Sequence, residues 1–388
     1  MALKITSKFR LQSRQKAPSF RFDRPLLIIQ SDDWGRVGVR DRSGFEQLRA
    51  AGVPLGQNPY DYYSLETGDD IGALHELLLQ HRDSAGRAAR VVMNFITANL
   101  DFERMRDRTV TRIALRPLHD GLPGKWRRPG LLDAYRAGVA DGVFHPALHG
   151  TTHFCSRAME RELEAGGQRS ELLHTFWDAD TPYVFSHMPW VGYEYWDPER
   201  RPKDRQLSLD EQAERIEDGV AHFGVMFGKG PTSACAPGYR ADRATHQAWL
   251  RAGIRVAQNG PAALAPHFSE DGILQLYRNV QFEPATDRAF SVANCLRATA
   301  ECFARGIPAI VCMHSINLHS SLKDFRTRTL AALDQLLSEL QKAYPTLLYI
   351  TDEDLHAIVT RGACDAPTSS IKVGVSQLLS GRSAAVPA

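Results

Sequence analysis

Two adjacent carboxylates follow an apolar run near the start of the chain. Leu26 to Ile29 read as a buried strand, and Asp32 and Asp33 come shortly after it. Two acids at the carboxyl end of a buried strand are costly unless a positive group lies between them. We therefore expect a divalent metal ion held by Asp33, with Asp32 free to take a proton from an attacking water. The alternative is a capped strand end, at which both acids begin a turn.

Two histidines offer further ligands for the same ion. His149 and His153 lie four residues apart in HGTTH, a spacing that brings both rings to one side of a turn. The filler GTT is poor in a helix interior, so we expect a tight turn or a first helical turn. His145 forms a second pair with His149, but Pro146 and the strand-like VFHPAL favour the pair 149/153. Because this spacing also arises by chance, two purely structural histidines are the alternative.

A further histidine, His314, ends the apolar segment AIVCMH. Two histidines and one carboxylate leave positions open on a zinc-like ion, as hydrolysis requires. His314 would then be the acid that protonates the leaving group. A hydrogen-bonded histidine at a strand end is the alternative.

Strands and helices alternate along the chain, which predicts a parallel sheet or barrel with helices outside. The candidate residues follow predicted strands, whose carboxyl ends would meet at one mouth. Residues 1–24 read as a polar lead-in, 25–362 as the barrel domain and 363–388 as a disordered tail. Between 155 and 205 we expect an insertion or lid that is rich in aromatic residues.

Composition excludes several classes of protein. The 388 residues include 47 Lys and Arg against 45 Asp and Glu, a balance that argues against bulk nucleic-acid binding. No apolar run approaches the roughly 18–20 residues that a transmembrane helix needs. The N-terminus is basic but has no apolar core of a secretory signal, so the cytoplasm is the expected location. Six scattered cysteines without a CxxC pair predict reduced core residues.

These motifs resemble those of the polysaccharide deacetylase family, carbohydrate esterase family 4, which has the NodB homology domain. SDDWG resembles its first motif, usually TFDDG, and HGTTH resembles its second, H(S/T)xxH. VMNFITAN, CAPGYR and CMH resemble further segments, and the order agrees over residues 26–318. The resemblance implies an irregular (β/α) barrel, usually seven-stranded. It also implies the same roles for Asp32 as base, Asp33, His149 and His153 as metal ligands, and His314 as acid.

Family members mostly remove N- or O-acetyl groups from sugars. We therefore predict a metal-dependent deacetylase of an acetylated carbohydrate or its precursor, with zinc as the ion and cobalt, nickel or manganese as alternatives. The backbone N–H of Tyr239 is expected to share the oxyanion with the ion. A branch of the family acts on cyclic amides or ureides, so an amidohydrolase on the same site is the second hypothesis. An inactive barrel that only binds carbohydrate is the third, and the oligomeric state stays open.

The chain departs from the family pattern at three positions. Trp34 stands where the family usually has glycine, and we expect it to narrow or shape the mouth. Cys235 takes the place of an arginine that orients the catalytic aspartate, and Arg240 is the candidate replacement. Gly150 replaces a common Ser or Thr, a change with little expected cost.

Aromatic residues of the insertion are expected to form a substrate lid, because sugar sites often use aromatic faces. A packed surface excursion is the alternative. The aromatic side chains concerned are His187, Trp190, Tyr193, Tyr195 and Trp196. Together with Trp34 and Arg240, three of them, Trp190, Tyr193 and Trp196, are the predicted substrate-binding residues.

Overall fold

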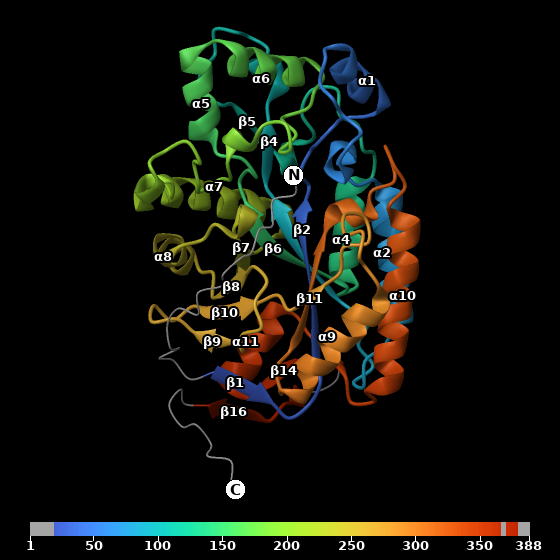
Figure 1. Cartoon of the computed structure of the whole chain (residues 1–388). Helices are drawn as coiled ribbons and strands as arrows, with labels where there is room; N and C mark the ends of the chain where they lie inside the picture. Colours follow the sequence, from blue (N-terminus) through green and yellow to red (C-terminus); the bar gives the residue numbers. More distant parts are fainter. Residues whose placement is uncertain (1–18, 366–369, 379–388) are drawn as a thin grey trace, which may run out of the picture.

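The computed structural model describes residues 19–365 and 370–378. One twisted sheet runs through the molecule, with helices packed around it (Figure 1). Its parallel strands are β2 (Leu26–Trp34), β3 (Val91–Ile96), β6 (Phe144–Gly150), β7 (Ser233–Cys235), β8 (Val256–Asn259), β10 (Leu274–Tyr277), β11 (Val280–Gln281) and β12 (Ala309–His314). β2 is buried along its whole length, as expected for a parallel strand covered on both faces.

The sheet closes on itself at one seam. β10 pairs with β8, whereas β11 pairs with β12 at the other end of the sheet. Only Arg278 and Asn279 separate β10 from β11, so the two ends of the sheet must meet. The amide of Arg278 donates to the carbonyl of Asn259, and the amide of Asn279 donates to the carbonyl of Ile310. β10 and β11 thus act as one interrupted strand, and the predicted irregular seven-stranded (β/α) barrel is confirmed.

Helices of the described residues surround this barrel. They are α1 (Arg42–Ala50), α2 (Gly68–Gln80), α3 (Phe102–Met105), α4 (Leu131–Ala140), α5 (Ser156–Ala165), α6 (Gln168–Asp178), α7 (Leu209–Phe227), α8 (Arg243–Arg251), α9 (Val292–Ala304), α10 (Arg326–Ala343) and α11 (Asp352–Arg361). α7 begins with a capping box of Ser208 and Glu211. α10 buries Leu333, Leu337 and Leu340 along one stripe and exposes its other face. Among these helices, none combines the length and apolar character needed to cross a bilayer.

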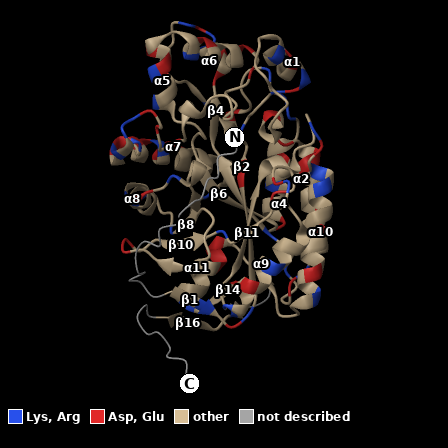
Figure 2. Ribbon diagram, viewed as in Figure 1, with Lys and Arg blue, Asp and Glu red and all other residues tan. Residues whose placement is uncertain are grey.

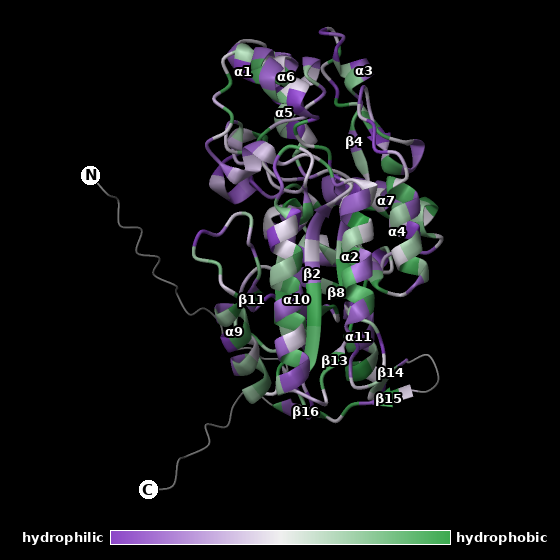
Figure 3. Ribbon diagram, turned by 90° about the vertical axis from the view of Figure 1, so that its right-hand side faces the viewer, coloured by the Kyte–Doolittle hydropathy of each residue, from purple (hydrophilic) through white to green (hydrophobic). Residues whose placement is uncertain are grey.

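The two ends of the barrel differ in character. The carboxyl end of β2 points toward the end that carries α1, α5 and α6, at the top of Figure 1. β2 changes from hydrophobic to hydrophilic toward that end (Figure 3). Lys, Arg, Asp and Glu are spread over the outer helices (Figure 2). The predicted insertion, residues 155–205, contributes α5 and α6 and short turns at the hydrophilic end.

Short strands extend the sheet and join the chain ends. They are β1 (Ser19–Phe22), β4 (Ala98–Leu100), β5 (Leu115–Pro117), β9 (His267–Phe268), β13 (Leu348–Tyr349), β14 (Ala363–Asp365), β15 (Ser370–Lys372) and β16 (Val375–Leu378). β1 pairs antiparallel with β16, so the expected lead-in and the expected disordered tail are partly ordered. The reason is the alternation in β1, which buries Phe20 and Phe22 in one cluster with Val373. Residues 1–18, 366–369 and 379–388 lie outside the described part, and the disorder predicted for the tail stays a prediction at 366–369 and 379–388.

Candidate metal and catalytic site

Asp33, His149 and His153 come together at the hydrophilic end of the barrel. Oδ1 of Asp33 lies 3.1 Å from Nε2 of His153 and 3.5 Å from Nε2 of His149. Asp33 and His149 are each 2% exposed. The three ligand-type atoms therefore lie within reach of one ion, as the spacing of the motifs predicted.

An irregularity in β2 places both aspartates inside the barrel. Successive side chains of a regular strand point to opposite faces. The pairing of β2 with β3 shifts between Ser31 and Trp34, and Asp33 has φ of 74°, in the left-handed region. Asp32 and Asp33 are consequently both buried next to the same site. A strained, non-glycine conformation at this point is typical of a functional position.

The outer nitrogens of both histidines are already engaged. Nδ1 of His149 lies 2.8 Å from the carbonyl oxygen of Cys235 and donates its proton there, which leaves a lone pair on Nε2. Nδ1 of His153 lies 2.9 Å from the hydroxyl of Tyr183, which can accept its proton. Burial and the neighbouring Arg36 lower the pKa of His153 well below its usual value, so its ring is neutral.

Oδ1 of Asp33 is a buried oxygen that receives no hydrogen bond. Together with the two Nε2 lone pairs it forms a set of electron donors that repel one another unless a cation lies between them. One carboxylate and two imidazoles suit zinc or a similar ion, and the residues present therefore fit a metal.

The second carboxylate oxygen of Asp33 is held by a cation of the chain itself. Nη1 of Arg36 donates to Oδ2 of Asp33 at 3.0 Å, and Nη2 of Arg36 donates to the hydroxyl of Tyr183 at 3.1 Å. Burial alone would raise the pKa of Asp33, but Arg36 and His153 outweigh it and hold that pKa well below its usual range. Asp33 is thus ionised and has one oxygen directed at the histidines.

Two other groups of ligand-type side chains occur among the described residues. The first is Asp32, His149 and Cys235, and the second is Glu283, Cys312 and His314. In the first, Asp32 is already paired with Arg278. In the second, Glu283 is hydrogen-bonded directly to His314 at 2.6 Å. Among these three groups, the one around Asp33 contains a carboxylate oxygen, Oδ1 of Asp33, that has no hydrogen-bond partner.

Asp32 is bound by Arg278, the residue at the seam of the barrel. Nη1 and Nη2 of Arg278 donate to Oδ2 and Oδ1 of Asp32, each at 2.5 Å, and Asn94 donates to Oδ1 at 2.7 Å. Burial alone would raise the pKa of Asp32, but Arg278 and then His149 outweigh it and lower that pKa below its usual range. The carboxyl is therefore ionised and fixed in orientation.

Arg240 does not replace the arginine that is missing at Cys235. Its exposed guanidinium lies 4.5 Å from the ring centre of Trp196, and Arg278 holds Asp32 instead. Arg278 lies at the break between β10 and β11, and its charged side chain is fully buried. A charged residue inside a segment that reads as a strand, LQLYRNV, was the available signal in the sequence.

His314 lies across from Asp32 at the end of β12. Its Nε2 is 3.8 Å from Oδ2 of Asp32, and its Nδ1 is 2.6 Å from Oε1 of Glu283. Burial alone would lower the pKa of His314, but Tyr60 and Glu283 outweigh it and raise that pKa well above its usual value. The imidazole is therefore protonated near neutrality, as a general acid must be.

The backbone N–H of Tyr239 is not free to act on an oxyanion. It donates to the carbonyl of Ala236 at 2.9 Å, within the turn Pro237–Tyr239. This corrects the prediction, and the reason is the tight turn that the sequence APGY forms. The hydroxyl of Tyr239 instead accepts a hydrogen bond from Nη1 of Arg278 at 2.9 Å.

The predicted substrate-binding aromatic residues separate into two groups. Tyr193 and Trp196 are half-buried and lie beside the site, with the ring of Tyr193 5.6 Å from that of His153. Trp34 is fully buried against Tyr135 of α4, because the shift in β2 turns it to the outer face of the sheet. Trp190 is only 6% exposed and packs in the main core cluster. Trp34 and Trp190 are therefore corrected from substrate contacts to core residues.

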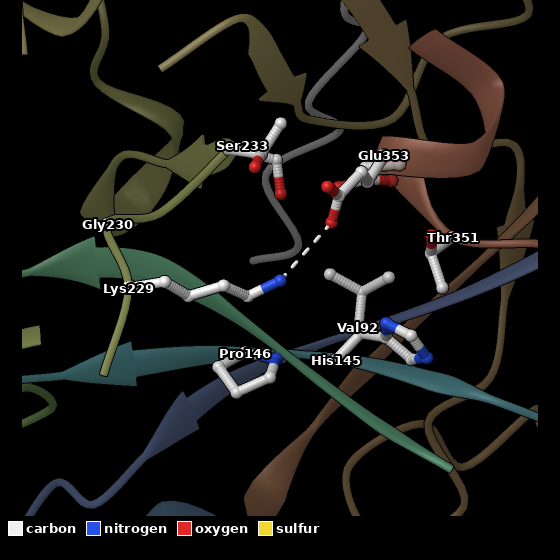
Figure 4. Close-up of a pocket in the computed structure, with 10 residues that line it drawn as sticks. Val92, His145, Pro146, Lys229, Gly230, Ser233, Thr351 and Glu353 are labelled. Carbon is white, nitrogen blue, oxygen red and sulfur yellow. Dashed lines mark ion pairs between the residues drawn. The ribbon is translucent and has the colours of Figure 1, made fainter. Parts of the chain in front are cut away.

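His145 belongs to a different part of the molecule. It lies near the start of β6, and His149 lies near its end, so the two side chains are about 13 Å apart along the strand. His145 lines a small cavity of about 30 Å³ together with Pro146 and Ser233, in which Lys229 and Glu353 form an ion pair at 3.5 Å (Figure 4). The choice of 149/153 over 145/149 thus agrees with the structure.

No family model matches the sequence, and no curated protein matches it. Solved structures do resemble the fold. A protein from Mycobacterium smegmatis assigned as a polysaccharide deacetylase is 13% identical, with 90% of this chain and 93% of that chain covered and a TM-score of 0.46. The allantoinase PuuE is 12% identical, with the same coverage and TM-score.

A pseudoenzyme of carbohydrate esterase family 4 from Bacillus anthracis is also similar. It is 10% identical, with 84% of this chain and 63% of that chain covered and a TM-score of 0.37. Likenesses at these identities concern the fold alone and do not choose among the three hypotheses drawn from the sequence. The structures similar to this chain include polysaccharide deacetylases and esterases of carbohydrate esterase family 4, the family that its motifs resemble.

Proposed function

We propose that the chain is a metal-dependent hydrolase that removes an acetyl group from an N-acetylated or O-acetylated carbohydrate. The observation that supports this most strongly is the convergence of Asp33, His149 and His153 beside Asp32. Three ligands of this kind hold a zinc-like ion and leave positions open for substrate and water. When bound, such an ion supplies Lewis-acid polarisation of the acetyl carbonyl.

Two residues of the chain, Asp32 and His314, each carry out one of the two proton transfers. Asp32, ionised and oriented by Arg278, takes a proton from the attacking water. His314, kept protonated by Glu283, gives a proton to the departing amine or alcohol. Nε2 of His314 lies 3.8 Å from Oδ2 of Asp32, so one reacting group bound beside them is within reach of both side chains.

A carbohydrate substrate is supported by the aromatic rim of the site. Tyr193 stacks on Phe185 at 5.1 Å and lies 6.2 Å from Trp196, so a group of aromatic rings lies next to the metal-ligand residues. Aromatic faces of this kind pack against sugar rings. The rim is contributed by the insertion, which is the part of the chain proposed as a lid.

The hypothesis of an inactive barrel was based on the arginine missing at Cys235. Arg278 supplies a guanidinium to Asp32 from the break between β10 and β11. The stated reason to suspect inactivity is therefore absent, and an active enzyme is the better proposal.

The experiment is acetate release from a panel of acetylated mono- and oligosaccharides, with allantoin and other cyclic ureides as the comparison. We expect acetate release by the zinc-loaded protein and a loss of at least about 10³-fold in Asp32→Asn and in Asp33→Asn. Ureide opening without acetate release would replace the proposal with the amidohydrolase. Saccharide binding without any turnover would favour the inactive barrel.

A further inference from the structure

Glu194 of the insertion reaches into the turn that joins the two candidate metal histidines. Its Oε1 accepts hydrogen bonds from the amides of Thr151 and Thr152, both at 2.9 Å. Glu194 is 2% exposed, so these amides are satisfied by a carboxyl and not by water. An unsatisfied buried amide costs about 1–3 kcal/mol, which makes this pair of bonds a strong constraint on the turn.

The opposite side of the turn is held by the backbone. The amides of Thr97 and Ala98 donate to the carbonyls of Gly150 and Thr151 at 3.0 and 2.9 Å. The hydroxyl of Thr151 donates to the carbonyl of Arg215 in α7 at 2.7 Å. Of these partners, only Glu194 offers a side chain to the amides of Thr151 and Thr152.

Gly150 is explained by the same carboxyl. A Cβ at this position would overlap Oε2 of Glu194, and Gly150 has φ of 153°, where side chains are strained. The glycine in HGTTH, which the sequence suggested to be of little consequence, therefore makes room for Glu194.

Glu194 is itself anchored on both sides. Tyr193 packs edge-on against His153, with ring centres 5.6 Å apart. Tyr195 is buried in a cluster with Leu148 of β6, and its carbonyl accepts from the amide of Leu207 at 2.9 Å. The carboxyl of Glu194 is thus held in place by its own neighbours.

We propose that Glu194 is a positioning residue of the metal site, whose carboxyl fixes the turn between His149 and His153 so that both imidazoles face Asp33. The inference rests on the proposed metal-dependent function. It assigns a role to the insertion in addition to any contact with substrate. Loss of a group that orients metal ligands from outside the coordination sphere typically changes metal affinity 10- to 100-fold.

The test measures the affinity of the purified, metal-free full-length chain for Zn²⁺ by competition with a chelating dye. Glu194→Ala is expected to weaken the zinc Kd about 10- to 100-fold and to alter the absorption spectrum of the Co²⁺-loaded protein. Glu194→Gln keeps an acceptor oxygen at the same place and is expected to stay within about threefold of the wild type. Should Glu194→Ala fail to fold, Glu194→Asp, which is one methylene shorter, takes its place in the same measurement.

Glu160→Ala is the matched control. Glu160 is also a buried carboxyl that accepts a backbone amide, that of Ile113 at 3.1 Å, but it lies on α5 and contacts Arg112 instead of the histidine turn. Its loss is expected to lower the unfolding temperature and to leave the zinc Kd and the Co²⁺ spectrum unchanged.

The outcomes separate the two proposals. If the wild type binds no zinc, the proposed metal-dependent function fails. If the wild type binds zinc and Glu194→Ala binds it equally well, the positioning role alone is overturned. An equal loss of affinity in Glu160→Ala would show a general effect of stability, and a loss in Glu194→Gln as large as in Glu194→Ala would refute the hydrogen-bond account.

Discussion

The guanidinium of Arg278 donates two hydrogen bonds to the carboxylate of Asp32, across 246 residues of sequence. The pair is fully buried, with side-chain exposures of 0% and 2%. Because Arg278 also contacts Gln30 and Gln258, it links the proposed base to the polar centre of the barrel. Geometry of this kind is specific to arginine, whose planar fork matches a carboxylate.

We therefore expect Arg278→Lys to fold but to lose about 10²-fold or more in kcat/KM, because one ammonium cannot replace two parallel hydrogen bonds. The zinc Kd should change little, because Asp32 is not one of the proposed ligands. Arg278→Ala should lower the free energy of unfolding by about 3–5 kcal/mol, since it leaves a buried charge unpaired. Arg305→Lys, at an exposed site, is the control; unchanged turnover in Arg278→Lys would refute the role of Arg278.

Glu283 should set the upper limit of the pH profile. A protonated His314 is required as the acid, and its pKa is raised by Tyr60 and Glu283 against the effect of burial. The acid form thus persists to higher pH than in a free imidazole, and activity falls only above the raised pKa. Glu283→Gln removes the carboxylate charge, lowers the pKa of His314 and should move the alkaline limb of kcat/KM to lower pH. An alkaline limb that stays in place would contradict this assignment.

Tyr193 and Trp196 should contribute to substrate binding and not to bond cleavage. For each change to Ala we expect KM for an acetylated oligosaccharide to rise about tenfold with a smaller change in kcat, because a ring contact of about 1.4 kcal/mol is lost. A small acetyl ester that does not reach the rim should be affected less. Trp190→Phe is the buried control and should alter stability but not KM. A rise in KM for Trp190→Phe, with no rise for the Tyr193 and Trp196 variants, would show that Trp190 contacts the substrate instead.

Removal of the ion should destabilise the fold measurably. Addition of Zn²⁺ to the chelator-treated protein at a hundredfold excess over its Kd should stabilise the native state by about 2.7 kcal/mol, seen as a rise in unfolding temperature. Asp33→Asn should abolish this rise. Mg²⁺ prefers six oxygen ligands and should have little effect, so equal stabilisation by both ions would argue against a site of two imidazoles and one carboxylate.

The sequence predicted the parts of the site that lie at the ends of apolar strands. Asp32, Asp33, His149, His153 and His314 each follow a buried run, and a parallel barrel brings such ends together. The alternation of strands and helices predicted the barrel itself. These features are local in the sequence or follow from topology, which is why they could be read from it.

Other features depend on register and on distant pairing. The shift in β2 sends Trp34 to the outer face, and an offset of one residue in a strand reverses which side chains face inward. Arg278 reaches Asp32 only because the interrupted strand closes the barrel. Tyr239 loses its free N–H to a turn whose hydrogen bond is not visible in residue types alone.

The break between β10 and β11 has a consequence for how the protein matures. Arg278 occupies this break, so it reaches the proposed base, Asp32, only when the sheet is closed at this seam. A chain in which the sheet is not yet closed at this seam would hold the histidines and Asp33 near one another, while Asp32 would still lack its guanidinium partner. Catalytic activity would then require the closed sheet, whereas zinc binding, which uses Asp33, His149 and His153, would not.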